Sequence, residues 1–273
     1  MSGLAGPLLL VGCGKMGGAL LAGWIANGLR AADTYVVEPD AALRTAARER
    51  HRVAAVAEPH ELPTDLRPQA IVFAVKPQAM ALVLPAYEPL ARSGAVVLSI
   101  AAGTAIARFE AAFGAATPVV RAMPNTPAAI GQGVTALFAN GHASARQREL
   151  CAALMAAVGQ VLWIDDEEQM HAITAMSGSG PAYVFYLIEV LAKAAIENGL
   201  PEGLAWPIAR ATVAGSAALA ASSRETVETL RRQVTSPAGT TEAALKVLMA
   251  PDGMQSLFAR ALAAATQRSR ELA

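Results

Sequence analysis

A buried strand followed at once by a glycine-rich turn and a helix is the feature of this sequence that most constrains its fold. The apolar run Leu8–Val11 is cut by the pattern Gly12-x-Gly14-x-x-Gly17, and a helical stretch that ends at Gly28 follows. Strand, glycine turn and helix in this order are typical of dinucleotide-binding domains. In such domains the free N–H groups at the start of the helix face the phosphates of the dinucleotide.

Each of the three glycines in this turn has a physical reason. Gly12 permits the tight turn, Gly14 lets the backbone approach a pyrophosphate, and Gly17 lets the helix pack closely on the strand. An ordinary glycine turn without a ligand is the alternative, and the position of the pattern between strand and helix argues against it. The turn residues that we expect to bind a dinucleotide are Gly12, Cys13, Gly14, Lys15, Met16 and Gly17.

An acidic residue follows the turn at the distance expected for contact with a ribose. The second predicted strand, residues 34–38, ends at Glu38, which lies about twenty residues beyond Gly17. A carboxylate there accepts hydrogen bonds from the adenosine ribose hydroxyls and repels a ribose 2′-phosphate. A surface glutamate before Pro39 explains the residue equally well, so the sequence leaves both interpretations open.

Further apolar runs indicate an α/β domain. They predict strands at 70–75, 95–99, 119–123, 133–139 and 160–164, with helices at 41–52 and 144–158. This alternation indicates a Rossmann-like, mainly parallel sheet, which we place in residues 1–165. Parallel sheets bind ligands at the carboxyl ends of their strands, where the candidate residues are Lys76, Ser99, Met123 and Asn125. A turn or cap explains each one alone, but together they favour a cofactor site.

Composition argues against several classes of partner. Lys plus Arg and Asp plus Glu both number 22 among 273 residues, so no net charge directs the chain to nucleic acid or an acidic membrane. Pro, Gly, Asn and Ser interrupt the long uncharged stretches, which argues against a membrane span. We expect no signal peptide, and no metal site because the four histidines lack ligand spacing. Cys13 and Cys151 show no paired spacing, which fits a reducing cytoplasm.

The second part of the chain, residues 166–273, is predicted to be entirely helical. The expected helices cover 167–175, 181–198, 202–222, 226–233, 237–249 and 254–271. Hydrophobic residues make up 54% of the chain and the mean hydropathy is +0.37, so the helices carry more apolar surface than one small domain buries. We therefore expect them to pack against a second subunit.

Two segments of the helical part have the composition of ligand sites. Residues 176–183 read M-S-G-S-G-P-A-Y, a flexible loop that enters a helix, and residues 234–241 read V-T-S-P-A-G-T-T. In the second segment Ser236 is predicted as the helix N-cap, with Pro237 in the first turn. The resulting neutral cradle for a carboxylate would consist of two hydroxyls and of the N–H groups of Gly239, Thr240 and Thr241. Plain helix capping is the alternative.

Four parts of the sequence together resemble the pyrroline-5-carboxylate reductase family, which catalyses the last step of proline biosynthesis. They are G-C-G-K-M-G-G at Gly12, F-A-V-K-P-Q at Phe73, R-A-M-P-N-T-P-A at Arg121, and S-G-S-G-P-A-Y at Ser177 followed by V-T-S-P-A-G-T-T at Val234. These motifs span the whole chain in the family's order and spacing. S-G-S-G-P-A-Y and V-T-S-P-A-G-T-T are highly specific in combination.

The resemblance implies a Rossmann-like domain followed by an all-helical dimerisation domain of the 6-phosphogluconate-dehydrogenase type, with five dimers often forming a ring. It implies that the glycine turn, with Ala74, Val75, Lys76 and Asn125, holds NADPH or NADH. It also implies that a small cyclic imine acid is held by Ser179, Ser236, Gly239, Thr240 and Thr241. Ser236 and Thr241 are the expected catalytic residues, with Thr241 near the ring nitrogen. A protonated imine attracts a hydride without a nucleophile, so positioning supplies most of the acceleration.

Three positions depart from the family pattern, and two other functions stay open. Ala238 replaces a usual Gly, His171 replaces a usual Asp, and Pro207 falls inside a predicted helix, where we expect a kink. A hydroxyacid or 6-phosphogluconate-type dehydrogenase requires a Lys close to the S-G-S-G loop, but the next one, Lys193, lies about three helical turns away. A cofactor-binding regulator without catalysis would be expected to lose the cradle first, yet Ser236 and Thr241 remain.

Overall fold

The computed structural model describes residues 6–273, which form two compact units. The first unit contains the chain as far as Gly178 together with residues 265–273, and the second unit contains Ser179–Ala264. The contacts therefore divide the chain about one helix later than the predicted boundary at residue 165. Helix α7 (Gln169–Ile173) belongs to the first unit because its buried side chains, Met170 and His171, pack there.

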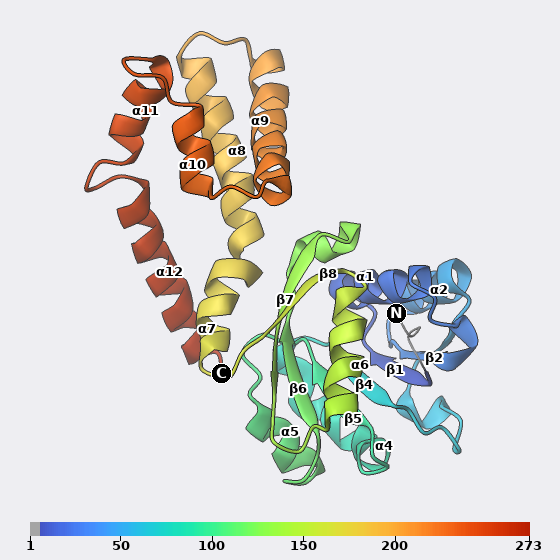
Figure 1. Ribbon diagram of the computed structural model, residues 1–273. Helices are drawn as coiled ribbons and strands as arrows, with labels where there is room; N and C mark the ends of the chain where they lie inside the picture. Colours follow the sequence, from blue (N-terminus) through green and yellow to red (C-terminus); the bar gives the residue numbers. More distant parts are fainter. Residues whose placement is uncertain (1–5) are drawn as a thin grey trace. The chain divides into compact units, whose positions relative to one another are not determined.

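An eight-stranded sheet forms the centre of the first unit, in the order β3-β2-β1-β4-β5-β6-β7-β8 (Figure 1). Neighbouring strands are parallel except β6 and β7. The strands are β1 Leu8–Val11, β2 Thr34–Val37, β3 Ala54–Val56, β4 Ala70–Phe73, β5 Val96–Ser99, β6 Val119–Met123, β7 Gly133–Ala139 and β8 Gly159–Trp163. The predicted Rossmann-like, mainly parallel sheet is confirmed. The sequence did not predict β3, since three residues are too short for a periodic signal.

Helices cover both faces of this sheet. The longer ones are α1 Lys15–Ala26, α2 Ala41–His51, α5 Ile106–Phe113 and α6 Ala145–Ala156. Shorter ones are α3 Met80–Val83, α4 Glu88–Ala91, α7, and the 3₁₀ turns Ala31–Asp33, Pro59–Glu61, Pro77–Ala79, Leu84–Tyr87 and Thr126–Ile130. Helices α3, α4 and α5 are additions to the predicted set, and the first two have only four residues each.

Alternating side chains of β1 supply both hydrophobic cores. Leu8 and Leu10 pack in a core with Trp24 of α1, whereas Leu9 and Val11 pack in a core on the opposite face with Phe109 of α5. All four β1 side chains are buried, as expected for a central parallel strand. Burial on both faces fixes the register of β1, and with it the position of the glycine turn that follows.

A partly buried ion pair joins β6 to the segment just before α7. The Arg121 guanidinium of β6 lies 2.6 Å from Glu167 Oε1, and only 7% of the Arg121 side chain is exposed. The same carboxylate oxygen accepts a hydrogen bond from Ile106 N–H at the start of α5, at 2.9 Å. Glu167 thereby connects a strand and a helix N-terminus to the segment that leads into the helical part of the chain.

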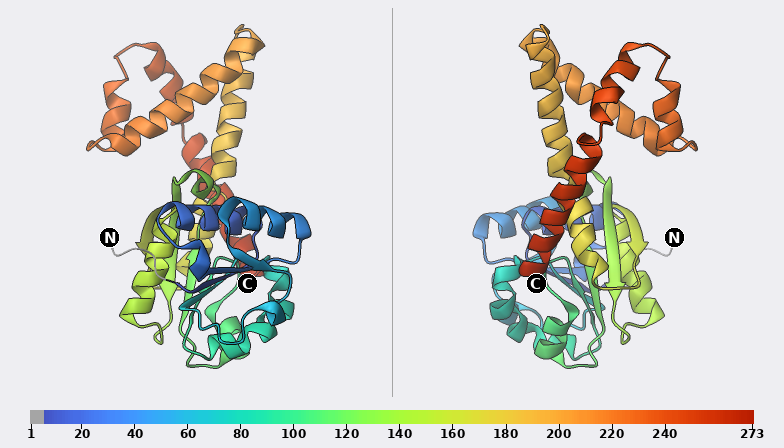
Figure 2. Two further views of the ribbon diagram at one scale, coloured as in Figure 1. Left: turned by 90° about the vertical axis from the view of Figure 1, so that its right-hand side faces the viewer. Right: turned by 90° about the vertical axis from the view of Figure 1, so that its left-hand side faces the viewer.

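Helices α8 Gly180–Glu197, α9 Glu202–Ser222, α10 Val227–Gln233, α11 Thr240–Leu248 and most of α12 Met254–Glu271 make up the second unit. Helices α8 and α9 lie side by side and bury the small side chains of Ala192, Ala205 and Ala209 (Figure 2). Pro207 lies inside α9, close to the start of the helix. The expected kink at this proline stays a prediction.

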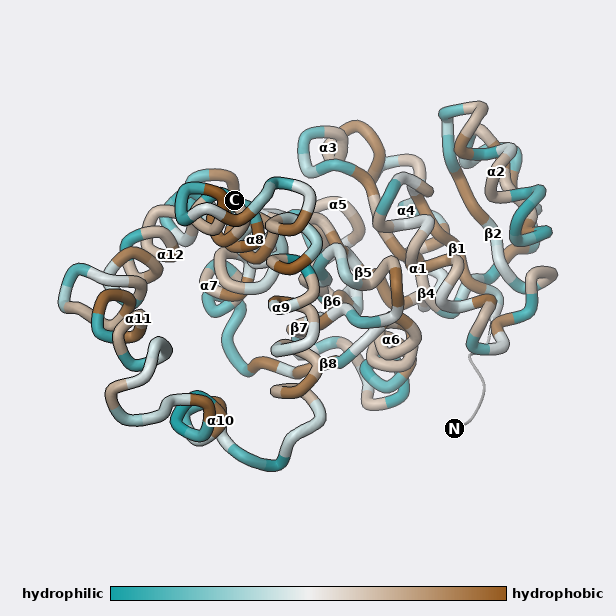
Figure 3. The backbone as a smooth tube through the Cα atoms, turned by 90° about the horizontal axis from the view of Figure 1, so that it is seen from above, coloured by the Kyte–Doolittle hydropathy of each residue, from teal (hydrophilic) through white to brown (hydrophobic). Residues whose placement is uncertain are grey.

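Many large apolar side chains of the second unit are exposed in the single chain. Brown, hydrophobic stretches recur along α8, α9 and α11 in Figure 3. Exposed examples are Phe185, Tyr186, Leu204, Ile208, Leu219, Val247 and Met249. Two helical segments, Gln169–Glu197 and Glu202–Ser222, are long and apolar enough to cross a membrane, and only 6% and 11% of their most apolar windows are buried. Such segments are weak evidence for a membrane span, because helices with an apolar contact face pass the same test.

Candidate active site

The glycine turn after β1 has the geometry that its sequence predicts. Gly12 has φ +88°, which favours glycine, and a Cβ there would lie 2.9 Å from the carbonyl oxygen of Ala74. A Cβ at Gly17 would lie only 2.3 Å from the Gly12 carbonyl oxygen. Both glycines are therefore required by close contact between the turn, α1 and the end of β4.

Gly14 is required for a different reason. A Cβ at Gly14 would have no protein atom within 4 Å, and the residue has φ −66°, which any residue can adopt. Gly14 is also the N-cap of α1, so the turn opens onto free space in front of the helix N-terminus. This open cradle fits a pyrophosphate, for which the protein backbone itself leaves room.

Glu38 lies beneath this turn and is only 6% exposed. Its Oε2 accepts a hydrogen bond from Cys13 N–H at 2.6 Å, and its Oε1 accepts one from Asp40 N–H at 3.0 Å. The alternative of a simple surface glutamate is therefore wrong, because the side chain turns inward to the backbone. Each carboxylate oxygen keeps a second lone pair, so contact with a ribose hydroxyl stays a prediction.

An apolar cavity of about 330 Å³ lies beyond the carboxyl ends of β1, β2 and β4. It is lined by Val11, Gly12, Val37, Pro39, Ala57, Glu58, Pro59, Val75, Ala79, Leu82, Val83, Ala86 and Tyr87. Sequence reasoning missed the contribution of Glu58 and Tyr87, because the short β3 that positions Glu58 carries no pattern. The cavity begins at the glycine turn and has the apolar walls that suit a purine ring.

The other predicted rim residues meet at the same edge of the sheet, since β4, β5 and β6 are parallel neighbours. Lys76 is exposed there. Ser99 is 1% exposed, and its hydroxyl accepts a hydrogen bond from Ala101 N–H. Asn125 is engaged within the protein: its Oδ1 accepts from Val134 N–H at 3.0 Å, and its Nδ2 donates to Ser177 Oγ at 3.3 Å. Binding of a cofactor by Lys76 and Asn125 stays a prediction.

The S-G-S-G segment is helical rather than a flexible loop. Residues Thr174–Gly178 form a π-helical turn that leads directly into α8, so the predicted loop is wrong. A Cβ at Gly178 would lie 2.3 Å from Met123 Cε, at the end of β6. The glycine is thus explained by close packing on the sheet, and Ser177 by its bond to Asn125. Ser179 follows as the residue before α8 and is half-buried.

The predicted substrate cradle differs in its helix start. Helix α11 begins at Thr240 with Gly239 as N-cap, so Ser236 is not the N-cap and Pro237 is not in the first turn. The cause is Ala238, whose φ of +56° is left-handed and cannot belong to a helix. Gly239 N–H donates to Ser236 O at 3.0 Å and is therefore not an orphan donor. The N–H groups of Thr240 and Thr241 remain in the first turn, where helical N–H groups have no intrahelical partner.

A carboxylate also lies beside this cradle, which is therefore not wholly neutral. Glu242 Oε2 accepts a hydrogen bond from Ala238 N–H at 2.5 Å. Glu242 also forms an ion pair with Lys246 at 3.4 Å. A hydroxyacid-type dehydrogenase would need a Lys close to the S-G-S-G segment, but the first Lys that follows this segment, Lys193 of α8, is 61% exposed and pairs with Glu189.

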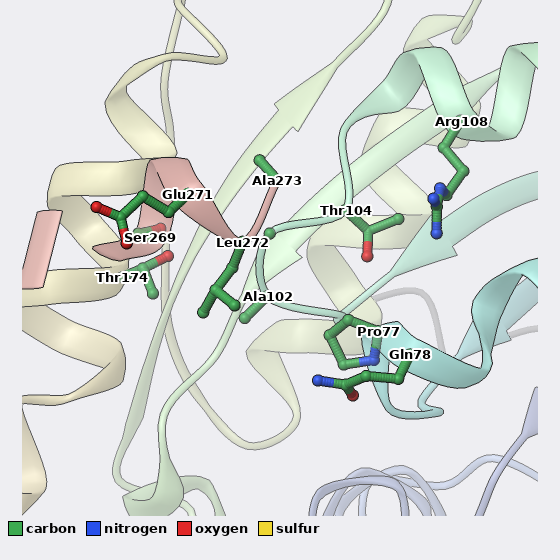
Figure 4. Close-up of a pocket in the computed structure, with 11 residues that line it drawn as sticks. Pro77, Gln78, Ala102, Thr104, Arg108, Thr174, Ser269, Glu271, Leu272 and Ala273 are labelled. Carbon is green, nitrogen blue, oxygen red and sulfur yellow. The ribbon is translucent and has the colours of Figure 1, made fainter. Parts of the chain in front are cut away.

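A second cavity of the first unit, of about 350 Å³, adjoins the rim (Figure 4). Pro77 and Gln78 lie on one side of it, and Thr174, Ser269, Glu271 and Leu272 lie on the other. Next to it the departure at His171 is explained, since His171 Nδ1 lies 3.0 Å from Ser269 Oγ and both side chains are buried. Within residues 6–273 no cluster of His, Cys, Asp or Glu could hold a metal ion.

Known proteins match both halves of the chain. A family model described as "Pyrroline-5-carboxylate reductase dimerisation" matches residues 167–272, and one described as "NADP oxidoreductase coenzyme F420-dependent" matches residues 8–103. A pyrroline-5-carboxylate reductase of Pseudomonas aeruginosa is 42% identical over 97% of this chain and 96% of its own length. One from Mycobacterium tuberculosis is 38% identical over 97% of this chain and 96% of its own length.

Solved structures agree with this assignment. A pyrroline-5-carboxylate reductase of Coxiella burnetii has a TM-score of 0.92 at 35% identity and covers 98% of both chains. The Plasmodium falciparum pyrroline carboxylate reductase, solved with NADP bound, has a TM-score of 0.81 at 28% identity and covers 97% of both chains. The fold and the glycine-turn site define an NAD(P)H-dependent oxidoreductase. More narrowly, the chain belongs to the pyrroline-5-carboxylate reductase family, and its reaction is the one that gives the family its name.

Proposed function

We propose that the chain reduces 1-pyrroline-5-carboxylate to L-proline with the dinucleotide on the first unit and the imine acid on the segment Ser236–Thr241. The observation that carries this assignment is the start of α11. There two first-turn N–H groups, those of Thr240 and Thr241, follow a left-handed residue and lie close in sequence to the hydroxyl of Ser236. A helix N-terminus of this kind binds a carboxylate.

The residues of the chain then have distinct tasks. Bound NADPH or NADH supplies the hydride. The N–H groups of Thr240 and Thr241 and the Ser236 hydroxyl hold the substrate carboxylate, and the Thr241 hydroxyl orients the C=N bond at its nitrogen. Because the protonated imine already carries positive charge, these residues need to position it rather than to activate it. The Gly12–Gly17 turn, with Lys76, holds the dinucleotide phosphates.

Two substitutions test the cradle. A hydrogen bond to a charged group contributes roughly 1.5–3 kcal/mol, and about 1.4 kcal/mol is tenfold in an equilibrium. Ser236→Ala should therefore raise KM for the imine acid by roughly ten- to a hundredfold. Thr241→Ala should lower kcat as well, because the C=N bond loses its orientation. Ser222→Ala removes an exposed hydroxyl elsewhere in the second unit and should change neither constant.

The affinity of the two cradle variants for the dinucleotide shows whether the cradle binds the substrate or the cofactor. Neither cradle variant should change the binding of NADH or NADPH, measured by fluorescence titration. If both variants reduce the imine normally while the affinity for the dinucleotide falls, then the cradle belongs to the cofactor and the assignment is wrong. Circular dichroism on each variant checks that α11 still folds.

The exposed apolar helices support a proposal about assembly. The dimerisation family model matches the second unit. Phe185, Tyr186, Leu204 and Ile208 of this unit are large apolar side chains whose exposure to water is unfavourable. We propose an obligate homodimer through this unit, acting in the cytoplasm on a small-molecule substrate, with active sites completed near the subunit boundary. The larger assembly that we propose is a ring of five such dimers. Light scattering, which measures the mass of the assembly in solution, tests it. A stable, active monomer at low micromolar concentration would overturn the proposal.

A further inference from the structure

The cavity beyond β1, β2 and β4 has one strongly acidic residue in its lining, Glu58. Strands β2 and β3 are parallel and pair Val37 with Val56. The residues that follow the two strands, as far as Pro39 and Glu58, therefore leave the sheet side by side. Both residues line the cavity, together with Gly12 of the glycine turn. Glu58 therefore lies beside the strand end that carries Glu38 and Pro39, at the edge of the cavity.

Glu58 is an exposed residue of the cavity lining. Tyr87, which lines the same cavity, is 1% exposed, and burial followed by the charge of Glu58 raises the pKa of its phenol. The phenol hydroxyl thus lies within electrostatic reach of the carboxylate. A second anion brought into this cavity would be repelled in the same way.

The neighbouring charges do not cancel this effect. Glu38 is a second carboxylate, and both of its oxygens already accept N–H groups of the backbone. Arg44 is a nearby cation, and its Nη1 donates to the carbonyl oxygens of Glu38 and Pro39, at 2.8 and 2.9 Å. Among the residues that line the cavity within the described chain, none is Lys or Arg.

We propose that Glu58 is a specificity-determining residue, whose carboxylate selects against a dinucleotide that carries a phosphate on the adenosine 2′-hydroxyl. The inference rests on the proposed binding of the adenosine end in this cavity. NADPH and NADH differ only in that phosphate, which adds negative charge where Glu58 already places one. Glu58 thus sets the preference between the two cofactors, while Glu38 holds the glycine turn for both.

Binding titrations of the unliganded enzyme with NADH and with NADPH test the proposal. Glu58→Gln should tighten NADPH about tenfold and change the Kd of NADH less than twofold, because only the charge is removed. Glu49→Gln removes the same charge from the exposed far part of α2 and should leave the ratio of the two Kd values unchanged. In the unmodified enzyme this ratio should move toward NADPH as salt rises, since salt screens repulsion, and this dependence should weaken in Glu58→Gln.

The opposite results overturn the proposal. A preference of the unmodified enzyme for NADPH that decreases with salt would show that Arg44 captures the phosphate. An unchanged ratio in Glu58→Gln would show that the carboxylate does not act there. Ala57→Trp fills the same cavity and should weaken both dinucleotides. If Ala57→Trp weakens the binding of neither dinucleotide, the adenosine end binds elsewhere. That result would overturn the assignment of the adenosine site to this cavity, on which the role of Glu58 rests.

Discussion

The backbone N–H of Cys13 donates to Glu38 Oε2 at 2.6 Å, so the acid at the end of β2 holds one N–H group of the glycine turn. That N–H is consequently unavailable to a pyrophosphate. The turn is shaped by a buried carboxylate, and its remaining donors at the start of α1 face the open space above Gly14. The contact ties the second strand to the turn that follows the first.

Glu38→Ala should therefore weaken the binding of NADH and NADPH alike. Loss of a hydrogen bond donated to a charged acceptor costs roughly 1.5–3 kcal/mol, which is about ten- to a hundredfold in Kd. Glu38→Gln keeps an oxygen acceptor for Cys13 N–H and should lose less. Titration with both dinucleotides measures the effect. A selective gain in NADPH affinity in Glu38→Ser would show instead that the carboxylate acts mainly against the 2′-phosphate.

Two glycine substitutions in the same turn should separate binding from folding. Gly14→Ala adds a methyl group that meets no protein atom at a φ of −66°, so the free energy of unfolding should hardly change. Dinucleotide binding should nevertheless fall at least tenfold, because the methyl group occupies the place of the pyrophosphate. Gly17→Ala drives the new methyl group into the Gly12 carbonyl oxygen and should destabilise the fold itself. Urea unfolding beside titration checks both, and normal binding by Gly14→Ala would remove the pyrophosphate from this turn.

Ala238→Gly should stabilise the protein. A left-handed conformation costs a non-glycine residue about 1–2 kcal/mol, and the added freedom of glycine in the unfolded chain cancels about 0.4–1 kcal/mol of the gain. We expect a net rise of up to about 1.5 kcal/mol in the free energy of unfolding, measured in urea. Ala153→Gly, at an exposed position inside α6, should instead lose about 1 kcal/mol. A loss of stability in Ala238→Gly would mean that the turn is not strained.

The two cysteines should react slowly in the native protein and faster as the pH rises. Burial, followed by the charge of Glu38, raises the pKa of the Cys13 thiol to about 11, and burial raises that of Cys151 to about 12. Since the thiolate is the reactive form, labelling by a disulfide reagent should accelerate about tenfold per pH unit between pH 8 and 10. The protein unfolded in urea should react at once at pH 8.

The same raised pKa values give the sign of a stability effect. The folded state favours the neutral thiols, so their contribution to stability is fully present below the unfolded thiol pKa of about 8.5. It is lost as the pH rises toward 11. Rapid labelling of Cys13 at pH 8 in the native protein would show that the glycine turn opens on the timescale of the reaction.

Local patterns in the sequence were enough to predict the Rossmann-like sheet, the glycine turn, the helical second part and the family. Leu8–Val11 is apolar throughout because its strand is buried on both faces. Gly12 takes a positive φ in the turn, and Gly17 packs on the Gly12 carbonyl oxygen of the same turn. The predicted bounds of strands β6 and β7 agree with the structure to the residue, since each is a mainly apolar segment between turn residues.

The contacts of the polar side chains, by contrast, depend on the folded chain. Whether Glu38 faces solvent or Cys13, and whether Asn125 holds Ser177, depends on partners 25 and 52 residues away, which no local pattern encodes. The start of α11 was misplaced because a left-handed alanine is rare enough that the sequence favours a helix from Pro237. Glu58 enters the cavity only because a three-residue strand pairs with β2. Long-range pairing positions such groups, and therefore only the folded chain reveals them.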